Sequence, residues 1–278
     1  MISRKRAPIQ KLFRLGKKLF EETLFLFDSG FDADRRIESR TPIFYHMPHG
    51  QAANGITKQV VRDFHQLANQ IIRNKNQIQY PAIANLTFIT YSNYQAKTLL
   101  ERCYDAYGMT NYVVVGREVL KWHWMAKIQP VLTYLESTEC PSEYIVLTDA
   151  RDVLMVNNPS QIIQYFESYH CDLLFCNTMA DWPPNKTYRD FETLTYYTHP
   201  LHCRLSAGGY IARKSALMNY LRQIIEAATE GAPWTQYKGG FDDQLSWRHL
   251  HCNYYPHIKV DYKSLIFRRF DSFRFLDY

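Results

Sequence analysis

Short apolar runs alternate with longer segments of helical periodicity between residues 84 and 176. Apolar runs bounded by turn residues predict strands, and they lie at 86–90, 112–115, 144–147 and 172–175. Segments with the helical pattern lie between them, at 95–107, 125–135 and 160–169. Strands that alternate with helices favour a largely parallel sheet with helices on both faces. Because such sheets bind ligands beyond the carboxyl ends of their strands, we expect the chemistry to follow the strands.

Residues 1–80 show a different pattern, and we expect them to form a helical extension before a main domain over 81–278. Apolar residues at helical spacing predict a basic amphipathic helix over 9–27 and a second amphipathic helix over 56–74. No catalytic motif stands out in either segment. The extension is therefore expected to be an accessory region, and the main domain is expected to carry the chemistry.

Beyond residue 176 the alternation of strands and helices fades. The pattern there predicts a Trp-Pro-Pro loop at 182–184, a Ser-Ala-Gly-Gly turn at 206–209, a helix over 216–228 and a last strand ending near Phe267. Together with the preceding segments, this predicts an α/β fold with a mixed, mainly parallel, Rossmann-like sheet flanked by helices.

The chain carries a formal net charge of +6 over 278 residues, and seven of its basic residues lie within the first 18. The remainder is closer to neutral, so we do not expect nucleic acid as a partner. The basic helix is expected to lie on an anionic membrane surface or, as the alternative, to pack on the protein itself. The 278-residue sequence shows no secretion signal, no run of about 18 apolar residues and no Cys-x-x-Cys pair. These features predict a cytoplasmic protein, peripheral on the inner membrane face.

Two aspartates, Asp149 and Asp152, follow the apolar run 144–147. Carboxylates at the end of a buried strand are costly to desolvate unless a positive group pairs with them. Hard cations such as Mg²⁺ and Mn²⁺ prefer oxygen ligands and share them with substrate phosphates. The pair therefore predicts a clamp for a metal and a diphosphate, with a turn cap and an ordinary ion pair as the alternative. His46 and His49 lie in an N-terminal loop, and we interpret them as surface residues rather than ligands.

Three further motifs are weak when each is taken alone. Gly208 and Gly209 precede a strand-like run and would let the backbone approach a ligand closely, or simply form a turn. The adjacent Asp242 and Asp243 would act as a general base or contact sugar hydroxyls, or else cap a helix. Trp182, in its Pro-rich loop, would stack on a sugar or close over it, or else be a packing residue.

In this order and spacing, the motifs resemble the glycosyltransferase domain of the lysyl hydroxylase and procollagen galactosyltransferase family, over residues 84–270. The matching segments are Phe88-Ile-Thr-Tyr91, Leu147-Thr-Asp-Ala-Arg-Asp-Val153, Leu173-Leu-Phe-Cys-Asn177 with Asp181-Trp-Pro183, Leu205-Ser-Ala-Gly-Gly209, Asp242-Asp-Gln244 and Val260-Asp-Tyr-Lys-Ser-Leu-Ile-Phe267. No single segment is decisive, and the ordered set carries the resemblance.

The resemblance implies a GT-A fold, a UDP-sugar donor and Mn²⁺, or Mg²⁺, as the metal. Asp149 and Asp152 match the residues that hold the metal, and Asp149 is also expected to contact the donor. The other positions expected to bind the donor are Thr90, Lys127, Trp182, Ser206, Gly208 and Gly209. Asp242 and Asp243 match an acidic run that faces the sugar or the acceptor, so they are the candidates for a catalytic base.

The chain departs from the family pattern in three places. Ser206 replaces the Asn of the family's turn, and the family's long acidic run is shortened to 241–243. The family also supplies a metal-ligating His from a His-Gly segment beyond the late strand, and the 278 residues contain no such segment. The candidates for a third ligand are His249, His251 and His257, or a water molecule.

These patterns predict a hexosyltransferase that moves galactose or glucose from a UDP-sugar to a hydroxyl of a glycan, lipid-linked or protein acceptor. Inversion and retention of the anomeric centre both remain open, and only inversion requires a base for the acceptor proton. A nucleotidyltransferase is disfavoured because residues 91–95 lack a Gly-rich basic loop. A catalytically degenerate sugar-nucleotide-binding protein or a membrane-associated scaffold is the other alternative.

Overall fold

The computed structural model describes most of the chain beyond Arg40. The described residues are 41–47, 56–74, 78–121, 123, 125–199 and 203–269. They belong to one compact unit, Thr41–Tyr278. The basic helix expected over 9–27, and His49, lie outside the described residues.

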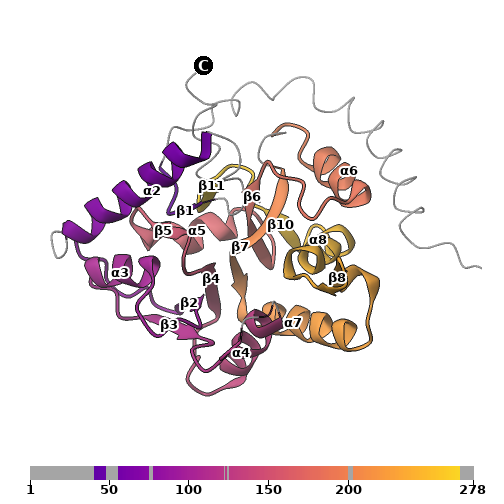
Figure 1. Ribbon diagram of the computed structural model, residues 1–278, viewed down its shortest axis with the longest axis horizontal. Coiled ribbons are helices and arrows are strands. Elements are labelled where there is room, and N and C mark those ends of the chain that lie inside the picture. The colour runs from indigo at the N-terminus through magenta and orange to yellow at the C-terminus, as the bar shows by residue number, and fades with distance from the viewer. Residues whose placement is uncertain are drawn as a thin grey trace, which may run out of the picture. The chain divides into compact units, whose positions relative to one another are not determined.

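A six-stranded sheet forms the centre of this unit, with the strand order β10-β6-β7-β4-β2-β3 (Figure 1). The strands are β2 (Leu86–Tyr91), β3 (Tyr112–Val115), β4 (Tyr144–Asp149), β6 (Leu173–Thr178), β7 (Arg204–Arg213) and β10 (Ile258–Val260). β7 runs antiparallel to its neighbours β4 and β6, and the other pairs are parallel. The prediction of an α/β fold with a mixed, mainly parallel sheet is confirmed.

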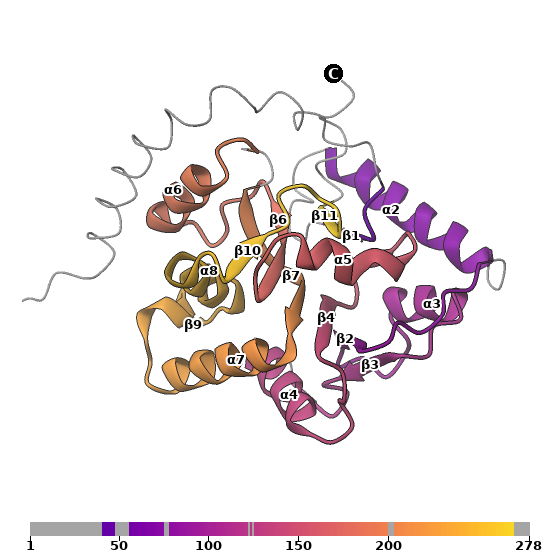
Figure 2. The same cartoon turned by 180° about the vertical axis from the view of Figure 1, so that it is seen from behind.

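Helices cover both faces of the sheet because side chains alternate along each strand. In β4, Ile145 and Leu147 belong to one core and Val146 to the other. The first core is shared with α4 (Met125–Glu136), α7 (Lys214–Thr229) and α8 (Asp243–Tyr254), and the second with α3 (Leu99–Ala106) and α5 (Ile162–Glu167). Figure 1 shows α4 and α7 side by side at one end of the sheet. Seen from behind in Figure 2, α6 (Lys186–Thr195) lies next to α8.

The described residues of the segment 41–74 belong to this unit, which begins at Thr41. A second, three-stranded sheet consists of β11 (Phe267–Arg269), β1 (Phe44–His46) and β5 (Val153–Met155), in that order. β1 therefore hydrogen-bonds with strands from two later parts of the chain. The helix expected over 56–74 forms as α2 (Ile56–Arg73), and Phe64 of α2 and Cys103 of α3 belong to one buried cluster. These contacts join the N-terminal segment to the main fold.

The Ser-Ala-Gly-Gly segment 206–209 is not a turn, because it lies inside the ten-residue strand β7. Its pairing with β6 shifts register between Phe175 and Cys176, so that 207–209 form a bulge on that side. On the other side Gly209 pairs with Thr148 of β4. A bulge makes a strand bend and re-aims the neighbouring side chains, and this one lies beside the end of β4.

The last third of the described chain contains elements that the sequence pattern left unassigned. They are α6, the short hairpin of β8 (Gln236–Tyr237) and β9 (Gly240–Phe241), and β10. A helix does begin after Asp242, as the capping interpretation of the two aspartates required. Among the described residues, no helix is both long enough and apolar enough to cross a membrane.

Candidate metal centre

Asp149 and Asp152 lie at the carboxyl end of β4, the strand between β7 and β2. Asp149 is the last residue of the strand, and Asp152 directly precedes β5. Asp152 is buried, whereas the Asp149 side chain keeps 32 % of its surface exposed. The two aspartates therefore lie at the edge of the sheet where ligands of α/β proteins bind, as their spacing predicts.

His46 joins these aspartates from the end of β1. Because β1 pairs antiparallel with β5, His46 lies opposite Val153, the residue after Asp152. Its Nε2 is 3.2 Å from Oδ2 of Asp152 and 3.9 Å from Oδ2 of Asp149. His46 is buried, so the interpretation of it as a surface residue is wrong. Strands pair with β1 on both sides and remove it from solvent.

Gly208 and Gly209 provide the space for this approach. A Cβ on Gly208 would lie 2.2 Å from Cε1 of His46, and a Cβ on Gly209 would lie 3.2 Å from the ring of Phe267. Any larger residue at 208 would push the imidazole away from the aspartates. The space beside these two glycines is thus occupied by the side chains of His46 and Phe267.

Lys127 of α4 pairs with one of these aspartates, Asp149, and with Asp243. Its Nζ lies 2.7 Å from Oδ1 of Asp149 and 3.1 Å from Oδ2 of Asp243, and it donates a hydrogen bond to the carbonyl oxygen of Ala207. Desolvation lowers the pKa of Lys127, but the two carboxylates outweigh it and raise that pKa above its usual value. The amine is therefore a permanent cation that bridges the end of β4 and the start of α8.

Opposing effects act on the carboxyl of Asp149. Desolvation raises its pKa above the usual value and Asp152 adds to the rise, while Lys127 and His46 lower it. One carboxylate oxygen faces Lys127 and the other faces His46. The net rise means that the surrounding protein disfavours the negative charge. A divalent cation beside this carboxylate would relieve that penalty.

Asp242 and Asp243 have different surroundings at the start of α8. Asp242 is the N-cap, and its Oδ1 accepts a hydrogen bond from the backbone N–H of Leu245 at 2.7 Å. Burial and the charge of Asp243 raise the pKa of Asp242 and the capping hydrogen bonds lower it, so that the net value is about 6. Asp243 is buried and pairs with Lys127. Asp243 is thus linked to the end of β4, and Asp242 has the pKa of a base that works near neutral pH.

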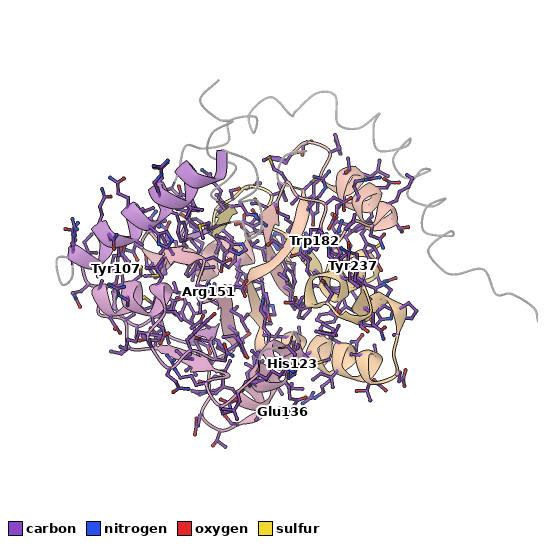
Figure 3. All side chains as sticks on the ribbon, in the orientation of Figure 1. Tyr107, His123, Glu136, Arg151, Trp182 and Tyr237 are labelled. Atoms are coloured by element: carbon purple, nitrogen blue, oxygen red, sulfur yellow. The ribbon has the colours of Figure 1, made fainter. Side chains whose placement is uncertain are left out.

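The remaining predicted positions lie at different depths. Thr90 is buried in β2, and its hydroxyl donates a hydrogen bond to the carbonyl oxygen of Thr148, one residue before Asp149. Ser206 is buried within β7. Trp182 lies on the surface, in the loop between β6 and α6 (Figure 3).

The three histidines considered as a third ligand lie apart from the aspartate pair and have other partners. These partners are Trp234 for His249, Tyr196 for His251 and Asp172 for His257. Burial lowers the pKa of His249 to about 4 and that of His251 to about 3. Both imidazoles are therefore neutral near pH 7 and packed among other rings. His46, from the opposite end of the main fold's sequence, lies beside the aspartates instead.

The donor set suits a divalent cation. One imidazole nitrogen and two carboxylate oxygens, from His46, Asp149 and Asp152, all lie within 4.8 Å of one another. Carboxylates suit Mg²⁺ and Mn²⁺, and an imidazole beside them is compatible with Mn²⁺. Nδ1 of His46 is buried and has no hydrogen-bond partner within the described part of the chain. Nε2, which lies close to both aspartates, is therefore the ring nitrogen of His46 that faces the site.

A scan against models of known protein families finds no match, and no curated protein matches the chain. The resemblance to the lysyl hydroxylase and procollagen galactosyltransferase family therefore stays a prediction.

Proposed function

We propose that this protein is a metal-dependent glycosyltransferase of the GT-A fold that moves a hexose, galactose or glucose, from a UDP-sugar to an acceptor hydroxyl. One observation carries the proposal. Two strand-end aspartates and a buried histidine from a distant strand converge on a small volume at the carboxyl end of β4, next to a buried lysine. The ordered sequence motifs support the choice of donor.

The role of the metal follows from the leaving group. Breaking the bond between the anomeric carbon and the diphosphate builds negative charge on the phosphate oxygens. Mn²⁺ or Mg²⁺, held by His46, Asp149 and Asp152, would offset that charge. Lys127 fixes the position of Asp149 and holds a second positive charge nearby. Charge on the diphosphate would thus meet a preorganised positive site.

The acceptor side of the reaction is assigned to the start of α8. Asp242 has a carboxyl that titrates near neutral pH, which suits a base that removes the acceptor proton if the anomeric centre inverts. Asp243 is committed to Lys127 and acts as a positioning residue. Thr90, hydrogen-bonded to Thr148, keeps β2 in register with the end of β4.

The donor is tested by ligand-dependent stability and by turnover. A ligand that binds the native state alone stabilises it by about 2.7 kcal/mol at a hundredfold excess over its Kd. We expect UDP with Mn²⁺ to raise the melting temperature and EDTA to remove most of the rise. UDP release from a panel of UDP-hexoses, measured with Mn²⁺, then identifies the sugar. Equal stabilisation by ATP or GDP, with no UDP release, would favour a nucleotidyltransferase or a binding protein over this proposal.

The location is a separate proposal. The basic segment 9–27 is proposed to hold the protein on the inner, anionic face of a membrane, where each Lys or Arg contributes about 1 kcal/mol. Deleting residues 1–27 should abolish binding to anionic liposomes and leave the catalytic rate unchanged. A full-length protein that does not bind such liposomes would contradict it.

A further inference from the structure

Trp182 is 51 % exposed, although tryptophan is among the side chains that gain most from burial. Its ring meets Tyr237 of the β8–β9 hairpin edge to face, with ring centroids 5.3 Å apart and planes at 78° (Figure 3). The ammonium of Lys238, at the tip of the hairpin, lies 5.4 Å from the centre of the Tyr237 ring. Two aromatic rings and a cation thus form a corner on the surface, which we call the aromatic corner.

The loop that carries Trp182 is held in place residue by residue. Arg248 of α8 donates hydrogen bonds to the carbonyl oxygen of Pro183, at 2.6 Å, and to Oδ1 of Asp181, at 3.0 Å. Gln244 of the same helix donates to the carbonyl oxygen of Trp182 itself. The exposed ring therefore stands on a backbone that has little freedom to move.

The side chains that hold this loop include buried charges. The Arg248 side chain is 1 % exposed, and it also forms a bidentate pair with Glu192, which is 0 % exposed. Burying such charges costs desolvation energy that their attraction repays only in good geometry. A rigid, exposed aromatic ring loses little conformational entropy when a ligand packs against it, which is the property of a binding surface.

The aromatic corner is also connected to the candidate metal centre. Asp243 and Gln244 are adjacent at the start of α8: Asp243 pairs with Lys127, and Gln244 both holds Trp182 and accepts a hydrogen bond from the backbone N–H of Ala207. One helical turn thus fixes the corner relative to the end of β4. A molecule on the corner would lie on the side of α8 where Asp242 begins the helix.

The shape of the corner selects its occupant. A planar nucleobase stacks best between parallel rings, whereas these rings stand nearly perpendicular. A pyranose is a saturated ring that presents C–H groups to aromatic faces and hydroxyls around its edge, and the Lys238 ammonium and the Tyr237 hydroxyl are available to hydrogen-bond them. We propose that Trp182 and Tyr237 bind a pyranose ring of the acceptor, so that the acceptor is a carbohydrate and Trp182, matched by the family resemblance to a donor-binding position, belongs to the acceptor side. This rests on the proposed function, because it assigns the second substrate of the same reaction.

The test measures saccharide binding without donor. Full-length protein is titrated with methyl β-galactopyranoside, methyl β-glucopyranoside and lactose, and binding is followed by saturation-transfer NMR in the absence of nucleotide and metal. We expect saturable binding of at least one of them, weakened about tenfold by Trp182→Ala and by Tyr237→Ala, the effect of losing a good ring contact. Tyr197→Ala is the matched control, because Tyr197 is an exposed tyrosine outside the corner.

Three results would overturn the inference. The first is that none of these saccharides binds, and the second is that the wild type and both corner variants bind them equally. The third is that uridine displaces the saccharide and that both variants lose affinity for uridine to the same extent. The last would place the donor base on the corner. Stabilisation by UDP and Mn²⁺ is measured in parallel. If it is present while saccharide binding is absent, the inference fails and the proposed function stands. If saccharides bind as expected but UDP and Mn²⁺ give no stabilisation, the proposed function fails and the carbohydrate site stands.

Discussion

Two clusters of buried charge flank the first turns of α8, and they differ in how completely their charges are paired. The metal-site cluster contains His46, Lys127, Asp149, Asp152 and Asp243. Within the described residues, its ion pairs join three carboxylates to a single lysine and a histidine. Asp149 still faces solvent with part of its side chain, and the protein raises its pKa. In the pairs between described residues, three carboxylates thus face two basic side chains.

The loop-anchor network contains Asp181, Arg189, Glu192 and Arg248. Two carboxylates meet two guanidinium groups, and Glu192 also accepts a hydrogen bond from the backbone N–H of Leu205. The positive charge of Arg248 is compensated, because its guanidinium donates hydrogen bonds to Glu192, Asp181 and the carbonyl oxygen of Pro183. We call this network closed, because its carboxylates and guanidinium groups pair with one another inside the protein.

The difference separates structure from function. A closed network stabilises the fold, and removing one member leaves an uncompensated charge in the interior. An open, acid-rich cluster destabilises the protein alone and gains from a cation, which is the arrangement expected of a binding site. The following predictions test whether the two clusters behave in these opposite ways.

The largest effect is expected from the closed network. Arg248→Met would leave Glu192 buried without its guanidinium, and we expect a loss of about 3–5 kcal/mol in the free energy of unfolding. Urea denaturation measures it. Arg222→Met is the control, because Arg222 pairs with Glu136 at the surface, where an ion pair contributes at most about 1 kcal/mol. Equal losses in the two variants would contradict the account of the loop-anchor network.

The open cluster should show the reverse pattern. Asp149→Asn and Asp152→Asn are expected to lower kcat for UDP-sugar turnover by about 10²–10³, the effect of removing one electrostatic stabiliser. Unfolding free energy should be kept or rise for Asp149→Asn, because the fold already disfavours the charge on Asp149. Asp190→Asn, which changes an aspartate paired with Lys186 at the surface, should leave turnover intact. Near-normal turnover with Mn²⁺ in both variants would place the metal site elsewhere.

A smaller effect tests the role of His46 through its neighbour. Gly208→Ala places a methyl group where the imidazole lies, and the ring must move away from the aspartates. We expect Mn²⁺ affinity to fall about 10–100-fold, the usual loss when a ligand's orientation is disturbed, as measured by isothermal titration calorimetry. Gly240→Ala is the matched control, because nothing lies within 4 Å of a Cβ at that position. Unchanged affinity in Gly208→Ala would remove His46 from the site.

The smallest effect concerns pH and the neutral histidine next to the closed network. Burial and, to a smaller extent, the charge of Arg248 together lower the pKa of His251 to about 3. The unfolded chain takes up a proton below about pH 6.5, whereas the folded protein does not until near pH 3. The stability that His251 contributes is therefore complete above pH 6.5 and is lost progressively as the pH falls from there toward 3.

The variant His251→Gln should flatten this part of the stability curve. The difference in slope is that of one proton, ~1.4 kcal/mol per pH unit, in urea unfolding measured between pH 6 and pH 4. A glutamine side chain can still hydrogen-bond with the Tyr196 hydroxyl, which lies 3.0 Å from Nε2 of His251. An unchanged slope would mean that His251 is protonated in the folded protein.

The sequence by itself determined the central strands and the place of the aspartate pair. The apolar run 144–147 became most of β4, because a strand buried on both faces leaves a continuous apolar signal. The run 112–115 became β3, a partly buried strand at the edge of the sheet. The position of Asp149 and Asp152 followed, since side chains after such a strand lie at the ligand-binding edge. The N-cap role of Asp242 was also readable as one of two alternatives, because capping depends on neighbours in the chain.

Only the tertiary structure decided what surrounds that pair. His46 lies 106 residues before Asp152 in the sequence, and only the pairing of β1 with β5 brings them together. The apolar run 43–45 was a weak sign that His46 ends a buried strand. From the sequence, Gly208 was expected to leave room for a ligand or to form a turn. It makes room for His46 instead, because a strand's neighbours depend on register and sheet order. Local patterns record burial and turns, whereas partners between distant strands are fixed by packing of the whole chain.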